Sequence, residues 1–474
     1  MIDFMIPLTD RKTPVYEQIY RFIRERIRDA RIPPRTKLPS TRSLADSLGI
    51  SRSTVQLAYE QLTAEGYLVP EPCRGYFSAD LSGVYDLGSL RKEAVQEEER
   101  DSLPPAQPLS VDFSPGGVDR EHFPISVWRH ITREILQEQA DLFDQGERQG
   151  EWQLRECIAG YLRSARLVDC RPAQIVIGAG SEYLLMLQNQ ILGEGPAAME
   201  DPTYMQAYHV FHGLGRRVVP IPMDRQGISI GALAASEARF VYVMPSHQFP
   251  TGIVMPARRR QELLAWAQED GRRYIIEDDY DSEFRYHGRP IPSLQGSSGS
   301  CQVIYMGTFS KAIAPAVRIA YMVLPEQLLP VYRSRCGHYA CTVPRMDQAI
   351  LTRFLQAGYF ERHLNRMRRI YRVKHDTLLE ALQPLTKDFS LSGEMSGLHI
   401  LLESRRGIPE REMIRRAGAA GVSVYGLSEY RIGRAAESHT ILIGYAACSE
   451  EEIRRGCRIL TECLGSSGAP ASGL

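Results

Sequence analysis

A segment in the second half of the chain carries side chains suited to amine chemistry beside an anionic group. Residues 305–321 read YMGTFSKAIAPAVRIAY, so Lys311 follows an apolar run and Arg318 comes seven residues later. A lysine just past a strand end can be desolvated, which lowers its pKa and makes the neutral amine nucleophilic. The hydroxyls of Thr308 and Ser310 and the donor fork of Arg318 suit a phosphate. A lone lysine is usually a solvated surface group, whereas this combination indicates a nucleophile beside a phosphate site.

This spacing resembles the cofactor-lysine motif of fold-type I pyridoxal-phosphate enzymes. The resemblance implies that Lys311 is the catalytic residue and forms a Schiff base with pyridoxal 5'-phosphate. A carboxylate must then meet the pyridine nitrogen, and residues 274–280, YIIEDDY, place acids at the carboxyl end of a predicted strand, where α/β sheets bind ligands. We predict Asp278 as this partner, with Asp279 as the alternative, and Tyr280 as a donor to the ring hydroxyl. Without the lysine motif, these acids would indicate only a solvated strand end or a helix cap.

A glycine-rich turn and a tyrosine fit the same cofactor. Residues 175–187 run from an apolar stretch through Gly180, Ser181 and Glu182 into a helical pattern. The free amides at a helix N-terminus can cradle a phosphate, although such a turn is weak support by itself. Tyr204 follows another apolar stretch and could stack on an aromatic ring. The alternative for Tyr204 is a half-buried tyrosine without a ligand.

A second candidate site, of a different kind, lies near the N-terminus. Ser51, Arg52, Ser53 and Thr54 place one guanidinium and three hydroxyls on the first turn of a predicted helix. A recognition helix presents that turn to DNA base edges, and an arginine can bond a guanine through two hydrogen bonds. The alternative is a surface helix capped by its serines, with Arg52 solvated.

The elements around that turn form a helix-turn-helix pattern. Pro14 begins a predicted helix, and the two prolines at positions 33 and 34 end it. Its apolar face carries Ile19, Phe22, Ile23 and Ile27. Ser40 caps a second helix that Gly49 ends, and Ser51 caps a third that runs to Gly66. Residues 67–69 and 75–77 then predict a two-stranded wing.

Residues 38–68, LPSTRSLADSLGISRSTVQLAYEQLTAEGYL, closely resemble the DNA-binding domain of GntR-type regulators, and the match extends over residues 14–77. The DNA-binding residues predicted from the helix turn and from this resemblance are Arg42, Ser51, Arg52, Ser53, Thr54, Gln56, Arg74 and Gly75. Two departures concern the wing and the turn before it. Arg35 stands where the family usually has glycine, and Cys73 stands where a second wing glycine often occurs.

Composition divides the 474 residues into three regions. Residues 1–80 are rich in helix signals, and residues 81–110 are rich in serine, glutamate and proline and are predicted to be a linker. From residue 111 to 474, short β-branched runs alternate with helical patterns, which predicts an α/β domain with a mainly parallel sheet. The expected protein is therefore multidomain.

Charge and cysteine usage narrow the classes of protein. The net charge is zero, but residues 11–79 hold twelve basic and seven acidic side chains, a local excess of +5 for DNA. Nine cysteines without a C-x-x-C pair predict neither a metal site nor a disulfide framework. Since we find no signal peptide and no membrane-spanning run, we expect a cytoplasmic protein that does not enter a membrane.

The four cofactor segments occur in the order of the aminotransferase class I fold, over about residues 111–465. Together with the GntR-type head, they make the chain resemble the MocR-type regulators. That resemblance implies a DNA-binding transcription regulator whose pyridoxal-phosphate-bound, aminotransferase-like domain senses the cofactor or a small amino compound. It also implies a double-stranded DNA operator and a head-to-tail homodimer, in which each head packs on the partner's large domain.

Two alternatives stay open. The first is an active aminotransferase that carries a DNA-binding head, and the second is a repressor whose large domain is only a scaffold. Aminotransferases place an asparagine where Phe249 stands here, so Gln248 or His247 would have to substitute. Their substrate-carboxylate arginine corresponds to Ile441 or Leu442, with two arginines upstream, at 431 and 434, as further candidates. We therefore expect sensing rather than steady turnover.

Overall fold

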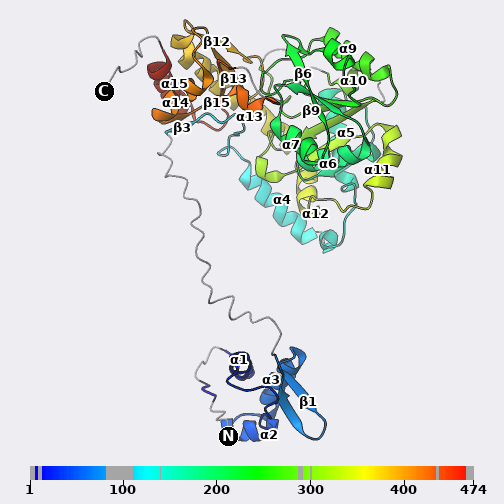
Figure 1. The fold of residues 1–474 in the computed structure, drawn as a ribbon, viewed down its shortest axis with the longest axis vertical. Coiled ribbons are helices and arrows are strands. Elements are labelled where there is room, and N and C mark those ends of the chain that lie inside the picture. Colours follow the sequence, from blue (N-terminus) through cyan, green and yellow to red (C-terminus); the bar gives the residue numbers. More distant parts are fainter. Residues whose placement is uncertain are drawn as a thin grey trace. The chain divides into compact units, whose positions relative to one another are not determined.

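The computed structural model describes residues 6–8, 13–81, 110–138, 140–286, 292–298, 302–433 and 437–465. The chain divides into two compact units, residues 1–105 and 106–474, and each is described by itself (Figure 1). The predicted linker lies almost entirely outside the described residues. No helix in these ranges is long and apolar enough to cross a membrane.

The first unit contains three helices and a hairpin. The helices are α1 (Val15–Arg28), α2 (Thr41–Leu48) and α3 (Arg52–Ala64), and β1 (Leu68–Glu71) pairs antiparallel with β2 (Gly75–Ser78). The predicted helix-turn-helix and wing are therefore confirmed. One boundary differs, because Pro14 has an extended ψ of 139° and is the N-cap rather than the first helical residue.

Local caps explain where these helices begin and end. The Ser40 hydroxyl accepts a hydrogen bond from the Ser43 amide at 3.1 Å, and the Ser51 hydroxyl accepts one from the Thr54 amide at 3.2 Å. Gly49 ends α2 with a φ of 67°, the left-handed conformation that glycine adopts without steric cost. The turn between α2 and α3 is thus fixed by residues within it.

The apolar faces of the three helices close one core. Ile19, Ile23, Leu44 and Val55 are almost fully buried in it, while Phe22 is only partly buried. Tyr59 is also buried, and its hydroxyl donates to the carbonyl of Pro39 at 3.0 Å. This contact ties α3 to the residue just before the cap of α2, so the recognition helix has a fixed orientation within the unit.

The second unit is built on an eight-stranded sheet of order β4-β11-β10-β9-β8-β5-β6-β7. The strands are β4 (Ile175–Gly178), β5 (Ala197–Asp201), β6 (Val218–Asp224), β7 (Gly227–Ile228), β8 (Phe240–Val243), β9 (Tyr274–Asp279), β10 (Val303–Thr308) and β11 (Ala320–Val323). The neighbours from β10 to β6 are parallel, whereas β11 and β7 run antiparallel. The predicted mainly parallel sheet is confirmed.

Helices cover both faces of this sheet (Figure 1). One face packs against α4 (Ile125–Glu138), α5 (Trp152–Arg166), α8 (Ile230–Ala234), α9 (Ala257–Gln268), α10 (Leu294–Ser298), α12 (Arg345–Gln356) and the start of α13 (Tyr359–Leu382). The other face packs against α6 (Ser181–Ile191), α7 (Met205–Gly213) and α11 (Leu329–Arg335). Because successive strand residues point to opposite faces, each strand's side chains divide between these two layers.

A smaller layer completes the unit. A four-stranded sheet has the order β12-β13-β16-β15, and β3 pairs in parallel with β14. These strands are β3 (Val111–Asp112), β12 (Phe389–Ser392), β13 (His399–Ser404), β14 (Val422–Ser423), β15 (Tyr425–Gly426) and β16 (Thr440–Gly444). They pack with the end of α13, α14 (Glu410–Ala419) and α15 (Glu450–Leu464).

Candidate functional site

The start of α3 presents its polar groups to solvent. Ser51, Arg52 and Ser53 are exposed, and the Ser51 hydroxyl contacts the hydroxyls of Ser53 and Thr54 at 2.8 and 2.7 Å. The Arg52 Nε donates to the Thr41 hydroxyl at 3.4 Å, and the residue is exposed. This is the arrangement that a recognition helix needs for reaching base edges.

The remaining predicted DNA-binding residues are also exposed. They are Arg42 on α2, Gln56 on α3, and Arg74 and Gly75 in the wing turn. Gln56 donates to Glu60 at 2.9 Å, and Arg74 pairs with Glu71 at 2.6 Å. These exposed pairs are weak, so a phosphate or base can replace them.

The positions where the GntR pattern has glycine show why glycine is common there. Arg35 and Cys73 have φ values of 56° and 60°, in the left-handed region where a side chain is strained. The fold keeps the backbone shape of the family at both positions without the residue that favours it.

A cavity of about 240 Å³ in the second unit brings the other predicted residues together. It opens at the carboxyl ends of β9 and β10, beside the N-terminus of α6. Its lining comprises Pro115, Gly116, Ser181, Glu182, Tyr204, Met244, Phe249, Asp278, Tyr280, Thr308, Ser310, Lys311, Pro315 and Arg318. Of the predicted cofactor residues, only Gly180 is not in this lining, and it lies directly behind the guanidinium of Arg318.

The two candidate aspartates point to opposite faces of β9. Asp278 shares the face of Ile276 and points into the cavity, where it accepts a short hydrogen bond from the Tyr242 hydroxyl. Asp279 points to the opposite face and accepts hydrogen bonds from Arg166 at 2.6 Å and Tyr305 at 2.5 Å. The alternative residue is therefore already paired on the other side of the sheet.

Burial governs the charge of Asp278. Desolvation raises the pKa of its carboxyl to about 7, while the hydrogen bond from Tyr242 opposes the shift. A positively charged partner inside the cavity would favour the ionised carboxylate. Asp278 is thus suited to hold a protonated ring nitrogen.

Lys311 lines the cavity from the turn after β10. Its ammonium donates to the carbonyls of Pro115 at 3.2 Å and Gly116 at 2.9 Å. Burial lowers the pKa of Lys311 to about 8, and the nearby Asp281 carboxylate partly opposes this. A much larger fraction of the amine is therefore neutral near pH 7 than for an exposed lysine.

The turn between β4 and α6, residues 178–181, brings groups suited to an anion beside Arg318 and is termed the cradle. Gly180, the N-cap of α6, has a φ of 95°, and any Cβ there would collide with the guanidinium of Arg318. Arg318 pairs with Glu182 at 2.8 Å and contacts the carbonyl of Ala179 at 3.3 Å. Ser181 on the same turn and Ser310, which also lines the cavity, add hydroxyl donors.

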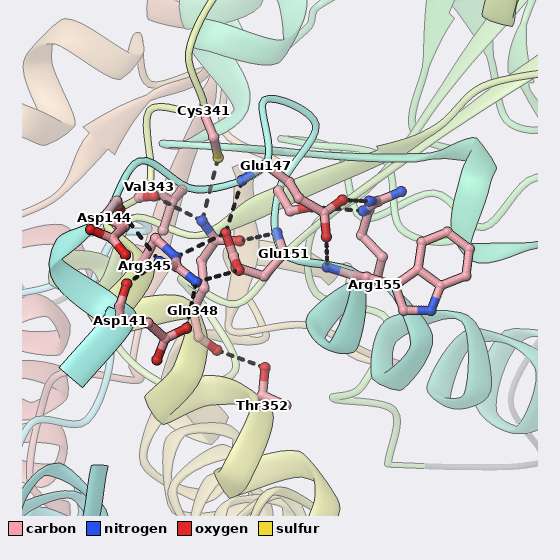
Figure 2. Close-up of polar contacts among 12 residues, drawn as sticks. Asp141, Asp144, Glu147, Glu151, Arg155, Cys341, Val343, Arg345, Gln348 and Thr352 are labelled. Carbon is pink, nitrogen blue, oxygen red and sulfur yellow. Dashed lines mark hydrogen bonds and ion pairs between the residues drawn. The ribbon is translucent and has the colours of Figure 1, made fainter. Parts of the chain in front are cut away.

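A polar network behind β4 holds this cradle in place. Figure 2 shows Arg345 between Asp141 of η1 (Ala140–Phe143) and Glu151, whose carboxylate it approaches to 3.3 Å. Gln348 accepts from the Glu151 amide at 2.8 Å, and the amide of Ile177 in β4 donates to the Gln149 carbonyl at 2.9 Å. The loop before α5 is therefore fastened both to α12 and to the strand that leads into the cradle.

Part of the cavity lining is aromatic. Phe249 makes edge contacts with Tyr204 and Tyr280, each with ring centroids 6.1 Å apart. His247 and Gln248, the two candidates for replacing an asparagine, do not line the cavity. His247 lies within 2.8 Å of Asp281, and Gln248 donates to the Pro202 carbonyl at 2.8 Å.

The sequence positions that correspond to a substrate-carboxylate arginine, and the nearby arginine that the structure describes, do not line the cavity. Ile441 and Leu442 are fully buried in β16, and Arg431 is not among the described residues that line the cavity. Arg434 lies outside the described residues. Sequence reasoning missed Tyr242 and the carbonyls of the 115–116 turn, because only the folded chain brings them to Asp278 and Lys311.

Comparisons with known proteins match this division of the chain. Residues 15–77 match the family "Bacterial regulatory proteins, gntR family", and residues 111–460 match "Aminotransferase class I and II". The chain is 33% identical to the probable rhizopine catabolism regulatory protein MocR of Rhizobium meliloti, with 97% of this chain and 96% of that protein covered. The chain belongs to the MocR-type transcription regulators.

Other MocR-type relatives agree. The uncharacterized HTH-type transcriptional regulator YdeL of Bacillus subtilis is 41% identical over 94% of this chain and 96% of its own length. The HTH-type pyridoxine biosynthesis transcriptional regulator PdxR of Corynebacterium glutamicum is 33% identical, with 93% of each chain covered. Like these relatives, this MocR-type chain is a DNA-binding transcription regulator, since GntR-type heads bind DNA operators.

Solved aminotransferases share the fold of the second unit. LysN of Thermus thermophilus, an α-aminoadipate aminotransferase complexed with N-(5'-phosphopyridoxyl)-L-leucine, is 28% identical with a TM-score of 0.67 and covers 75% of this chain and 92% of its own. The multiple substrate aminotransferase of Thermococcus profundus is 26% identical with a TM-score of 0.69, covering 81% and 98%. The fold of this MocR-type chain therefore implies pyridoxal-phosphate dependence, and its cavity has donors that fit a phosphate, a buried acid and an amine.

Proposed function

We propose that this regulator holds pyridoxal 5'-phosphate at Lys311 and changes its affinity for an operator when the cofactor or a small amino compound occupies the cleft. The observation that carries the proposal is the convergence of nine of the ten predicted cofactor residues on one cavity, with Gly180 directly behind it. These nine residues come from four separate segments of the chain, and a mere scaffold would not require them to meet.

Each group would have a defined role toward the cofactor. Lys311 would supply the amine for covalent attachment, and Asp278 would keep the ring nitrogen protonated, which makes the ring an electron sink. Tyr204 and Phe249 would contact the ring, while Arg318 and Ser181 would bind the phosphate. Tyr280 would stand nearest the ring hydroxyl, although its own hydroxyl now lies 2.9 Å from His247.

The segment that bonds Lys311, residues 110–119, connects the cleft to the linker in sequence. Residues 110–119 follow the linker directly, and their turn at Pro115 and Gly116 accepts both hydrogen bonds of the Lys311 ammonium. Asp119 anchors the far end through Lys374 at 2.7 Å. Covalent attachment of a ligand to the Lys311 amine would remove the N–H donors that hold this turn. The segment that leads to the DNA-binding head would then shift only if the ligand binds one conformation of the protein more tightly than another.

The two alternatives predict different behaviour. An active aminotransferase would convert amino acid to keto acid steadily, and the phenylalanine at position 249 and the isoleucine at position 441 disfavour it. A passive scaffold would bind no cofactor and would be indifferent to changes at Lys311. The lowered pKa of Lys311 and the free space around it support cofactor binding instead.

We also propose a homodimer. Large apolar side chains are exposed at successive points along one stretch of the second unit: Ile125 and Leu136 on α4, Phe143 on η1 and Trp152 on α5. Exposed apolar groups of this size mark association surfaces. Light scattering of the purified chain should give twice the mass of 53.5 kDa.

The experiment that tests the cofactor site is the visible absorption spectrum of the purified protein before and after borohydride. Wild type should show a band that borohydride abolishes, because reduction fixes the cofactor on the amine. Lys311→Ala should lack the band, while the exposed-site control Lys387→Ala should keep it. A wild-type protein that stays colourless with added pyridoxal phosphate would overturn the proposal.

A further inference from the structure

Glu182 has an unexpected position within the cradle. It lies in the first turn of α6, and its carboxylate pairs with Arg318 at 2.8 Å, directly above Gly180. A carboxylate at that place interacts favourably with the positive end of the helix. The chain therefore supplies its own anion at the point where a cofactor phosphate would be expected.

The cradle has too few hydrogen-bond donors to bind a phosphate and the Glu182 carboxylate at the same time. Arg318 is the cationic side chain on the cradle side of the cavity, and Lys311, the other described cationic side chain in the lining, bonds the 115–116 turn instead. A phosphate dianion at Gly180 would meet the Glu182 carboxylate at short range. Like charges at such a distance repel strongly unless one of them moves away.

Glu182 can be displaced without breaking the core. Its side chain is 38% exposed and that of Arg318 is 51% exposed, so their pair contributes little to stability. The carboxylate can therefore rotate outward when a stronger anion arrives. Such a displacement costs affinity but does not exclude the phosphate.

We propose that Glu182 is an internal competitor that occupies the phosphate cradle and weakens cofactor binding. The inference rests on the proposed function, because it assumes that the cofactor enters this cavity. Weaker binding would let the site release the cofactor readily, so that its occupancy would follow the concentration of free cofactor. A carboxylate that repels phosphate should not affect pyridoxal, which carries the same aldehyde and ring but no phosphate.

The test compares cofactor-free wild type with Glu182→Gln, which keeps the size of the side chain and removes its charge. Each protein is titrated with pyridoxal phosphate and, separately, with pyridoxal, by visible absorption. Glu326→Gln is the matched control, because Glu326 also forms an exposed pair with an arginine, Arg171 at 2.5 Å, but lies outside the cavity. Calorimetric titration with inorganic phosphate gives a readout independent of Lys311.

We expect Glu182→Gln to bind pyridoxal phosphate about tenfold more tightly than wild type, with a smaller gain at high salt, where charges are screened. Pyridoxal affinity should be unchanged, and Glu326→Gln should match wild type for both ligands. Equal or weaker binding of pyridoxal phosphate by Glu182→Gln would overturn the inference, as would an equal gain for pyridoxal. Failure of every variant to bind either compound would instead overturn the proposed function.

Discussion

The recognition helix and the cofactor cleft both offer polar groups to a ligand, but they hold them in opposite ways. The groups on α3 come from one short stretch of sequence, are exposed, and make hydrogen bonds mostly with their neighbours. Those in the cleft come from segments far apart in the chain, and burial shifts the pKa of Asp278 and of Lys311. Contacts of the head should therefore be separable, whereas those of the cleft should depend on one another.

This difference predicts which substitutions in one region alter ligand binding in the other region. A substitution on α3 should alter DNA affinity and leave the cofactor titration untouched, because its contacts lie within the first unit. A substitution in the cleft should alter cofactor binding and should change DNA affinity only when the cofactor is present. The following experiments test this asymmetry in order of decreasing effect.

Asp278→Asn should give the largest effect, a loss of about 100-fold in pyridoxal-phosphate affinity, because removing one partner of a buried charge pair costs several kcal/mol. Spectral titration measures it, with the exposed Glu237→Gln as the control. The cofactor-free variant should bind operator DNA like cofactor-free wild type. A loss of DNA affinity in that state would mean that the two regions are not separable in this way.

Arg52→Ala should weaken operator binding about 30-fold, since a bidentate arginine–guanine contact contributes roughly 1–3 kcal/mol. A gel-shift or anisotropy titration at fixed salt measures the change, and Arg28→Ala on α1 is the matched surface control. The cofactor titration should be identical to that of wild type. Equal losses in both arginine variants would indicate non-specific charge rather than base contact.

The rate of cofactor capture should depend on pH through Lys311. Only the neutral amine attacks the aldehyde, so with a pKa of about 8 the rate should rise roughly tenfold per pH unit below pH 8 and level off above it. With an unshifted amine, the rate of cofactor capture would keep rising until the pH reached the ordinary lysine pKa of 10.5. The unfolded chain binds more protons between these two values, so the same group should make the fold more stable as the pH rises through that window.

Arg74→Ala should have the smallest effect, about a threefold loss of DNA affinity, because a wing arginine contacts phosphate rather than a base. The dependence of log affinity on log salt should become shallower by about one unit. Arg31→Ala serves as the exposed control. A loss as large as that of Arg52→Ala would make the wing a base-reading element.

The local parts of the structure could be predicted from the sequence, and the long-range parts only in outline. The caps at Ser40 and Ser51 and the left-handed Gly49 depend on a few neighbouring residues, so their signals were sufficient. The choice between Asp278 and Asp279 depended on which face of β9 meets α6, and that is set by tertiary packing. The contact of Lys311 with the 115–116 turn joins residues far apart in the chain, so no local sequence pattern predicts it.

Substitutions at special backbone positions show a further limit. Arg35 and Cys73 keep positive φ values although neither residue favours them, because the surrounding turn and hairpin fix the backbone. Glu182 is predicted as a cofactor-binding residue from its place at the helix start, and the structure pairs its carboxylate with Arg318. Residue type and position did not predict this pairing, from which we propose that Glu182 weakens phosphate binding.

Occupancy of the cleft should change the affinity of the head for DNA. The decisive experiment measures the operator affinity of the full chain without cofactor, with pyridoxal phosphate, and with pyridoxal phosphate plus candidate amines, each beside Lys311→Ala. At least one of these ligands should change the affinity of wild type severalfold, and Lys311→Ala should not respond. Identical operator affinity in all of these states, for a protein whose spectrum shows a bound cofactor, would contradict this expectation.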